Sequence, residues 1–193
     1  MTPQDRLSAL IGLAPVKDYV ARLSAQVAFQ NHQTLRMSPS HLIFIGNSNT
    51  GKTTAARLIG EIYRDLGLLQ KGHLVEVRSS DLVGEFVGQS AFKTNAIIDM
   101  ALDGVLKVDE PNALLNRAGF GIESLGILLS RMTNTDNRLV VIFSGPPHSI
   151  EQFLHANPGL DRLFPANRII PFADYDADQL SEIRRFQSAQ GNS

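Results

Sequence analysis

The chain has 193 residues, of which 43% are hydrophobic and 19% charged, a balance that suits one soluble globular domain with a single core. Its net charge of −1 and its lack of Lys and Arg runs give no sign of the basic face that binds nucleic-acid phosphates, and the absence of cysteine excludes disulfides and thiolate metal sites. No secretion signal opens the sequence and no apolar run approaches the roughly 20 residues that span a bilayer, so we expect a cytoplasmic protein with neither membrane nor nucleic-acid partners.

The first predicted element is an amphipathic helix, because apolar residues recur at three- and four-residue spacing from Val16 to Val27. A polar stretch over residues 31–40 follows and predicts a loop. The sequence divides into an N-terminal helix and loop at 1–40, a core at 41–187, and a polar tail at 188–193.

Five short apolar runs predict strands, each covered on both faces by helices. Segments with helical spacing lie between them, and strand and helix alternate along the chain. This order predicts an α/β fold with a five-stranded parallel sheet and right-handed crossovers. The runs lie at 42–45, 74–77, 105–108, 139–143 and 168–170, and the helical segments at 54–66, 92–102, 122–132 and 177–186.

A glycine-rich turn after the first strand has the spacing of a phosphate loop, from Gly46 to Gly51, Lys52 and Thr53. The backbone N–H groups of such a loop form a concave nest, and the following helix presents its positive end to the phosphates. Lys52 is expected to reach the β- and γ-phosphates, and Thr53 to bind Mg²⁺. The strand-to-helix context argues against a chance match on a surface turn. We expect ATP and Mg²⁺ at Gly46, Asn47, Ser48, Asn49, Thr50, Gly51, Lys52, Thr53 and Thr54.

Two acidic residues follow the third strand. Asp109, at the strand's carboxyl end, is expected to face the Mg²⁺ through water. Glu110 is expected to polarise the attacking water as a general base. Alone, two acids at the start of a loop are common, but next to a phosphate loop they favour phosphoryl-transfer chemistry.

Several longer stretches carry a more specific signal. They read LIGL at 10–13, KGHLVEV at 71–77, DLVGEFVGQSA at 81–91, GVL at 104–106 before Asp109 and Glu110, and NPGL at 157–160. Over about residues 10–183 the chain resembles the AAA+ ATPases of the CbbX and stage V sporulation protein K type, which also occur in type VII secretion. The resemblance implies a P-loop NTPase sheet in the order 5-1-4-3-2. It also implies a ring, typically hexameric, that hydrolyses ATP to remodel a protein.

The same resemblance assigns further residues. Ile11, Gly12 and Leu13 are expected to line the adenine pocket, and Phe86 with Val87 and Gly88 is similar to a pore loop that grips a substrate protein. The alternative for Phe86 is an apolar loop residue that covers the core. Glycines on both sides, at 84 and 88, favour the pore loop because they leave the segment mobile.

The chain departs from the family in four ways. The helical lid with its sensor arginine is missing from these 193 residues. Leu163 stands where the finger arginine is expected, so Arg162, one residue earlier, is either the catalytic finger or a solvated helix-end charge. Pro146 replaces a polar sensor residue, which leaves Ser144 as the nearest substitute.

The fourth departure is Lys107, which stands in the strand before Asp109 where an apolar residue is expected. Alternation puts Lys107 on the same face as Asp109, and a buried lysine must pair with a carboxylate or reach an exposed edge. We expect a tolerated defect there, and we treat the five histidines as structural or surface residues because they lack metal-ligand spacing.

Two functions from different classes follow. The first is an ATPase acting in a homo-oligomer, or beside a complete paralogue, to remodel a protein. The second is a degenerate nucleotide-binding subunit with a structural or regulatory role and little hydrolysis, which the four departures favour and the intact Asp109–Glu110 pair opposes. A small-molecule kinase is weaker, since neither substrate-binding arginines nor a kinase lid are found.

Overall fold

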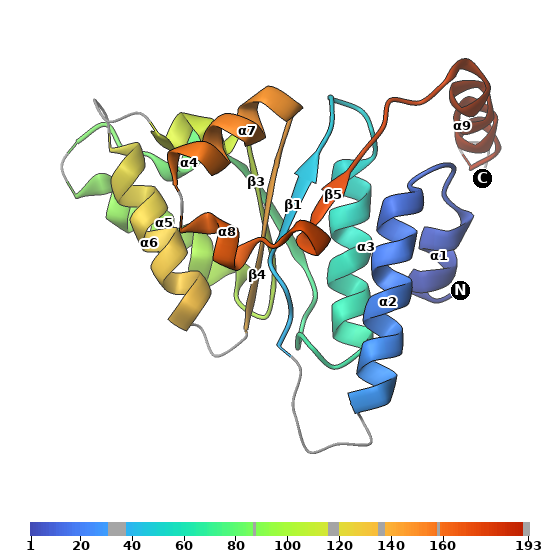
Figure 1. The fold of residues 1–193 in the computed structure, drawn as a ribbon, viewed down its shortest axis with the longest axis horizontal. Coiled ribbons are helices and arrows are strands. Elements are labelled where there is room, and N and C mark those ends of the chain that lie inside the picture. The colour runs from blue at the N-terminus through green and yellow to red at the C-terminus, as the bar shows by residue number, and fades with distance from the viewer. Residues whose placement is uncertain (31–37, 87, 116–119, 135–137, 158, 191–193) are drawn as a thin grey trace.

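The computed structural model describes residues 1–30, 38–86, 88–115, 120–134, 138–157 and 159–190. Helices and strands alternate through the core, as the sequence predicts (Figure 1). The strands are β1 (Leu42–Ile45), β2 (Leu74–Arg78), β3 (Gly104–Asp109), β4 (Leu139–Gly145) and β5 (Ile169–Pro171). The α-helices are α1 (Pro3–Ala9), α2 (Ala14–Gln30), α3 (Lys52–Asp65), α4 (Ser79–Leu82), α5 (Gln89–Ala101), α6 (Gly121–Asn134), α7 (Pro147–Ala156), α8 (Leu160–Leu163) and α9 (Ala177–Gln190), with 3-10 turns η1 (Pro111–Leu115) and η2 (Ala166–Arg168).

All five strands pair in parallel, in the order β2-β3-β4-β1-β5. This is the expected 5-1-4-3-2 order and confirms the predicted fold class. The register places Asp109 of β3 opposite Ser144 of β4, and Gly145 opposite Ile45 of β1. The carboxyl ends of the three central strands therefore meet at one edge, where open α/β sheets bind their ligands.

Helices cover both faces of the sheet (Figure 1). Alternation along β1 sends Phe44 into the core under α1, α2 and α3, and Ile43 into the core under α5, α6 and α7. Phe143 and Phe153 stack in the second core with ring centroids 4.7 Å apart. Burial of apolar surface on both faces explains why the central strands are continuous hydrophobic runs.

The outer strands and the termini differ from the simple expectation. At the sheet edge, β2 is only half-buried, and its Glu76 reaches solvent. A short helix that was not predicted, α1, begins with a capping box in which the Thr2 hydroxyl accepts from the Asp5 N–H. At the other end α9 continues to Gln190, so the first residues of the predicted tail are helical.

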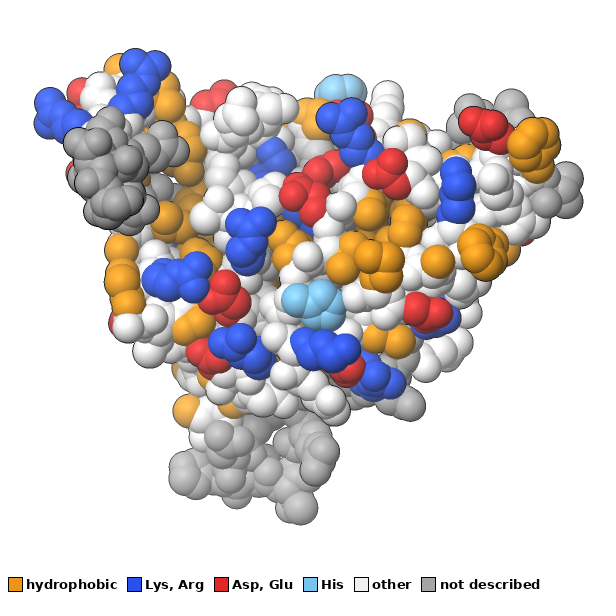
Figure 2. Space-filling model, turned by 180° about the vertical axis from the view of Figure 1, so that it is seen from behind, with side chains coloured by type: hydrophobic (Ala, Val, Ile, Leu, Met, Phe, Trp, Pro, Cys, Tyr) orange, Lys and Arg blue, Asp and Glu red, His pale blue; other side chains and the backbone are white. Residues whose placement is uncertain are grey.

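None of the helices in the described ranges is long and apolar enough to cross a membrane. On the face shown in Figure 2, Lys and Arg side chains are interspersed with Asp and Glu rather than gathered in one basic patch. A mixed surface of this kind agrees with the net charge of −1.

The buried His41 lies just before β1 and is held in its neutral form. Its Nδ1 accepts the Val141 N–H at 3.0 Å, and its Nε2 lies 3.2 Å from the Met132 carbonyl, to which it donates in this tautomer. Burial, opposed by the Met132 hydrogen bond, lowers the pKa of His41 from 6.5 to about 4. At mildly acidic pH, His41 is therefore protonated in the unfolded chain and neutral in the folded chain.

We expect His41 to destabilise the fold as the pH falls. Its contribution is complete above its unfolded pKa of 6.5 and is lost toward a pKa of about 4. From about pH 7 to about pH 5 the free energy of unfolding should fall by about 2 kcal/mol on this account. Urea unfolding at both pH values should show this slope in the wild type and a flatter one in His41→Asn, which keeps an acceptor for Val141. The exposed His148→Asn should match the wild type, and equal slopes in all three chains would contradict the assignment.

Candidate nucleotide site

A cleft of about 980 Å³ opens at the carboxyl edge of the sheet, where β1, β3 and β4 end. It is bounded by the phosphate loop, the ends of the three strands, and apolar residues from both ends of the chain. Of the predicted site residues, those that line it are Ile11, Leu13, Gly46, Asn47, Ser48, Asn49, Gly51, Lys52, Thr53, Thr54, Asp109 and Glu110. The structure thus brings together residues that the sequence predicted separately.

The phosphate loop has the close backbone packing that its glycines require. A Cβ on Gly46 would lie 2.5 Å from the Phe172 carbonyl oxygen, a distance that no side chain tolerates. Gly51 caps α3 with a φ of 89°, in the left-handed region that favours glycine. Thr50, although predicted to touch the nucleotide, is buried beneath the loop, where its Oγ1 donates to the Asn47 carbonyl at 2.8 Å. Thr50 therefore shapes the loop rather than lining the cleft.

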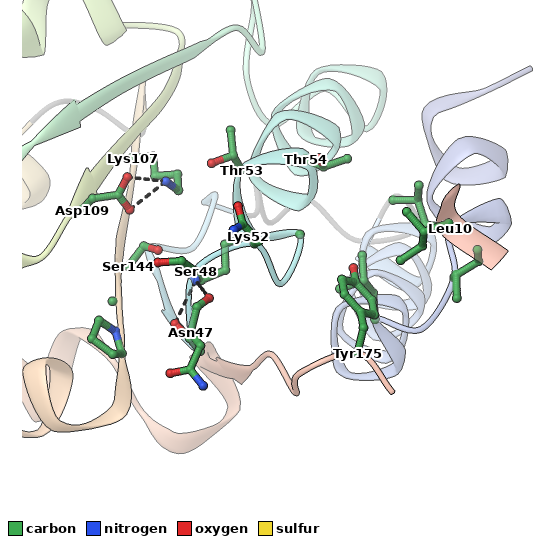
Figure 3. A pocket seen from close by; sticks show the side chains of 18 of the residues that line it. Leu10, Asn47, Ser48, Lys52, Thr53, Thr54, Lys107, Asp109, Ser144 and Tyr175 are labelled. Carbon is green, nitrogen blue, oxygen red and sulfur yellow. Dashed lines mark hydrogen bonds and ion pairs between the residues drawn. The ribbon is translucent and has the colours of Figure 1, made fainter. Parts of the chain in front are cut away.

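Lys52 lies inside the loop. Its Nζ donates to the carbonyl oxygens of Gly46, at 2.8 Å, and of Asn47 (Figure 3). Burial and the nearby charge of Lys107 lower the pKa of Lys52, and Asp109 and Asp174 act in the opposite direction. An ammonium held by neutral carbonyls and repelled by a second cation is well placed to bind an anionic phosphate.

Asp109 and Thr53, the predicted Mg²⁺ ligands, are joined by a hydrogen-bonded network. The Nζ of Lys107 lies 2.6 and 2.7 Å from the two Asp109 oxygens and 2.6 Å from Oε1 of Glu76. That same Glu76 oxygen accepts from the Thr53 hydroxyl at 2.7 Å. Of the two alternatives for Lys107, pairing with a carboxylate or reaching an exposed edge, the structure shows the first.

This network bears on whether the residues present fit a Mg²⁺ ion. Oxygen ligands are what Mg²⁺ prefers, and Thr53 and Asp109 offer them. Both carboxylate oxygens of Asp109, however, already bind the ammonium of Lys107, which is 2% exposed. A divalent cation at Asp109 would have to displace that ammonium or lie beside a like charge, so the residues fit Mg²⁺ poorly. In the described part of the chain, moreover, no three His, Cys, Asp or Glu residues form a metal-binding cluster.

Glu110 is exposed at the rim of the cleft. Its backbone is fixed on both sides: its N–H donates to the Ser144 carbonyl at 2.8 Å, and its carbonyl accepts from the Ser79 hydroxyl at 2.8 Å. Its φ is 54°, an unfavourable conformation for a residue with a side chain, which is often found at functional sites. Glu110 thus follows directly on the end of β3 and lines the cleft there.

Ser144 is the polar residue of β4 closest in sequence to Pro146, the position where a polar sensor was expected. It is fully buried in β4, lines the cleft, and its Oγ has no hydrogen-bond partner among the described residues. An unpaired buried hydroxyl that faces a cleft is suited to a phosphate oxygen. Pro146, two residues on, also lines the cleft but offers only its ring and carbonyl.

The far end of the cleft is apolar and suits a flat base. Leu10, Ile11 and Leu13 contribute to it from the N-terminal segment, and Tyr175 and Ile183 contribute from the C-terminal one (Figure 3). Burial raises the pKa of Tyr175, so its phenol stays neutral.

Gly12, which was predicted to line the adenine pocket, instead lines a smaller adjoining pocket of about 240 Å³. Gly12 has a φ of 68°, which glycine adopts freely, whereas the φ of 58° at Leu13, which lines both pockets, is strained.

Sequence reasoning missed several residues of the site. Tyr175 and Ile183 gave no motif, and Arg78, at the end of β2, adds a third cation to a lining that holds Lys52 and Lys107. Asp174 accepts from the Asn47 amide at 3.0 and 3.1 Å and so braces the phosphate loop. For Arg78, Asp174 and Tyr175 the only sequence signal was a position at or just after the end of a strand. Many residues share that position, so it does not identify a binding site.

Two predicted residues lie away from the cleft. Arg162 is exposed on α8 and is not part of the lining, which leaves open both its role as a finger toward a neighbouring subunit and its role as a solvated charge. Phe86 is 70% exposed and therefore does not cover the core. Val87 of the predicted pore loop and residue 158 of the NPGL stretch lie outside the described residues.

Sequence comparisons agree with this geometry. The family model described as ATPase family associated with various cellular activities (AAA) matches residues 42–163. The ESX-3 secretion system protein EccA3 of Mycobacterium tuberculosis is 41% identical over 97% of this chain and 31% of its own length. Stage V sporulation protein K of Bacillus subtilis is 37% identical over 94% of this chain and 58% of its own length. The chain thus spans less than two thirds of these curated relatives.

Solved structures share the fold. The FIGL-1 AAA domain in complex with ADP superposes with a TM-score of 0.64 over 92% of this chain and 58% of that one, at 20% sequence identity. A likeness at that identity supports the architecture only, whereas the family match covers the phosphate loop, Asp109 and Glu110 together. The chain belongs to the AAA family of ATPases, with relatives of the CbbX, stage V sporulation protein K and type VII secretion type.

Proposed function

We propose that this chain binds ATP in the cleft and hydrolyses it slowly, as one subunit of an oligomer that remodels a protein partner. The observation that carries the proposal is the convergence of Lys52, Ser144 and Glu110 on one cleft with an apolar far end. The ammonium and the free hydroxyl suit phosphates, the carboxylate suits the attacking water, and the apolar end suits adenine. The ADP bound to the FIGL-1 domain supports a nucleotide ligand for this fold.

Slow hydrolysis is proposed because Arg162, the candidate finger arginine, is not among the residues that line the cleft. As a finger it would therefore act on the nucleotide of a neighbouring subunit. A trans arginine contributes about 10³–10⁵ in turnover in related phosphoryl-transfer systems. An isolated subunit therefore lacks the largest single contribution to the rate, and assembly is expected to restore it.

A second candidate is a nucleotide-binding subunit with a structural or regulatory role and little hydrolysis. The ion pair between Lys107 and Asp109 favours it, because Asp109 is then engaged within the protein. Both candidates share the ATP site and differ in turnover.

The test is a calorimetric titration with ATP and ADP, together with the mass of the protein in solution with and without ATP. Saturable binding and a larger, ATP-dependent assembly that releases phosphate support the leading proposal. Binding by a monomer without turnover supports the second candidate. No heat of binding with either nucleotide at about millimolar concentration, where even weak sites fill, would reject both.

Phe86 is proposed to grip the protein partner. Because it is 70% exposed, Phe86→Ala should change the free energy of unfolding by less than about 0.5 kcal/mol. It should nevertheless lower any ATP turnover that an added unfolded protein stimulates. Phe92→Ala, at a residue 77% exposed on α5, is the matched control and should keep that stimulation. A loss of about 3–5 kcal/mol in Phe86→Ala, the range for a core phenylalanine, would rule out a free loop residue.

A further inference from the structure

The ammonium of Lys107 binds Asp109, one of the two residues expected to bind a metal ion, and is linked to the other, Thr53, through Glu76. It donates to Asp109 at 2.6 and 2.7 Å and to Glu76 at 2.6 Å, and its side chain is 2% exposed (Figure 3). The register explains the geometry: Glu76 of β2 pairs with Lys107 of β3, and Asp109 follows two residues later on the same face. Three charges from two neighbouring strands therefore share one face of the sheet.

The network continues to the phosphate loop. Oε1 of Glu76, which accepts from Lys107, also accepts from the hydroxyl of Thr53 at 2.7 Å. Thr53, Glu76, Lys107 and Asp109 thus form one chain of contacts that ends at the residues lining the cleft.

Lys107 shares the cleft with two other cations, since Lys52 and Arg78 also line it. The three N–H donors of the Lys107 ammonium are taken by Asp109 and Glu76, so its charge offsets those two carboxylates rather than the phosphates. Lys52 and Arg78 are left to bind a triphosphate beside carboxylates whose repulsion Lys107 reduces without a metal ion.

We propose that Lys107 is a built-in counter-cation that takes the place of Mg²⁺ at Asp109, while Glu76 engages the Thr53 hydroxyl, so that nucleotide binding depends little on divalent cations. The inference rests on the proposed ATP site. It assigns a role to a residue that the sequence alone marked as a tolerated defect. If instead the lysine only closes an internal ion pair, Mg²⁺ should still strengthen ATP binding in the wild type.

The first experiment measures the ATP dissociation constant of the full wild-type chain in MgCl₂ and in EDTA. The two constants should agree within about three-fold, a difference near the error of the method. In Lys107→Met, which keeps an unbranched side chain one atom shorter and removes its charge, ATP should bind at least about ten-fold more weakly in EDTA than in MgCl₂. A wild type that binds ATP at least about ten-fold more weakly in EDTA would overturn the proposal.

The second experiment needs no nucleotide, so its result is independent of the proposed function. Mn²⁺ is titrated into each chain and free Mn²⁺ is followed by electron paramagnetic resonance. Lys107→Met should bind Mn²⁺ at the freed Asp109 and Glu76 carboxylates, the wild type should not, and adding Asp109→Asn to the variant should abolish binding. Equal Mn²⁺ binding by the wild type and Lys107→Met contradicts the proposal.

Two controls complete the design. Circular dichroism establishes that Lys107→Met is folded, and Lys107→Leu replaces it if it is not. If the wild type binds no ATP under either condition, the proposed function fails while the Mn²⁺ comparison still decides the role of Lys107.

Discussion

Replacing Glu110 with Gln should lower phosphate release by about 10²–10⁴, the usual contribution of a general base. Gln keeps the size of the side chain but cannot take a proton from water. Glu110 is exposed at the rim, and its carboxylate makes no hydrogen bond within the described ranges, so the change should disturb neither the fold nor the loop. The ATP dissociation constant should stay within about two-fold of the wild-type value, because only chemistry is removed.

The measurement is phosphate release at saturating ATP, at a protein concentration high enough for subunits to associate. Glu123→Gln, at an exposed glutamate on α6 away from the cleft, is the matched control and should retain the wild-type rate. If Glu110→Gln and the wild type release phosphate equally fast, Glu110 is not the base. The remaining candidates would then be residues brought by a neighbouring subunit.

Lys52→Ala is expected to have the largest effect on binding. The ammonium of Lys52 is expected to make two charge-assisted hydrogen bonds to phosphate oxygens, each contributing about 1.5–3 kcal/mol. Their loss corresponds to an ATP dissociation constant that is roughly 10²- to 10⁴-fold larger. Lys52→Arg should also bind more weakly than the wild type, because a planar guanidinium cannot reproduce the contacts that Nζ makes with the Gly46 and Asn47 carbonyls.

Calorimetry with ATP checks this prediction, and thermal unfolding of each variant separates a binding effect from damage to the loop. Lys71→Ala removes one exposed lysine near the opposite end of the sheet, before β2 begins, and should bind ATP as the wild type does. Unchanged affinity in a folded Lys52→Ala would mean that nucleotide binds elsewhere. It would also mean that the phosphate loop keeps its sequence but no longer binds nucleotide.

The sequence by itself determined the fold class, because its signals are local. A buried run such as 42–45, a glycine turn and a helix occupy consecutive residues, and their order requires a parallel sheet. The phosphate loop, Asp109 and Glu110 could be found for the same reason, since strand ends meet at one edge whatever the details of packing. The position of Lys107 beside Asp109 also follows from two-residue alternation.

Only the tertiary structure decided which residues meet across long sequence separations. Glu76 and Lys107 are 31 residues apart and Asn47 and Asp174 are 127 apart, so no periodicity could pair them. The hydrogen bond from the Val141 N–H to the buried His41 spans 100 residues. Such contacts depend on strand register and on how helices cover the sheet, which the whole packed core fixes at once. The sequence therefore located most residues of the candidate cleft, and the packing of β2 against β3 decided which cation Asp109 holds.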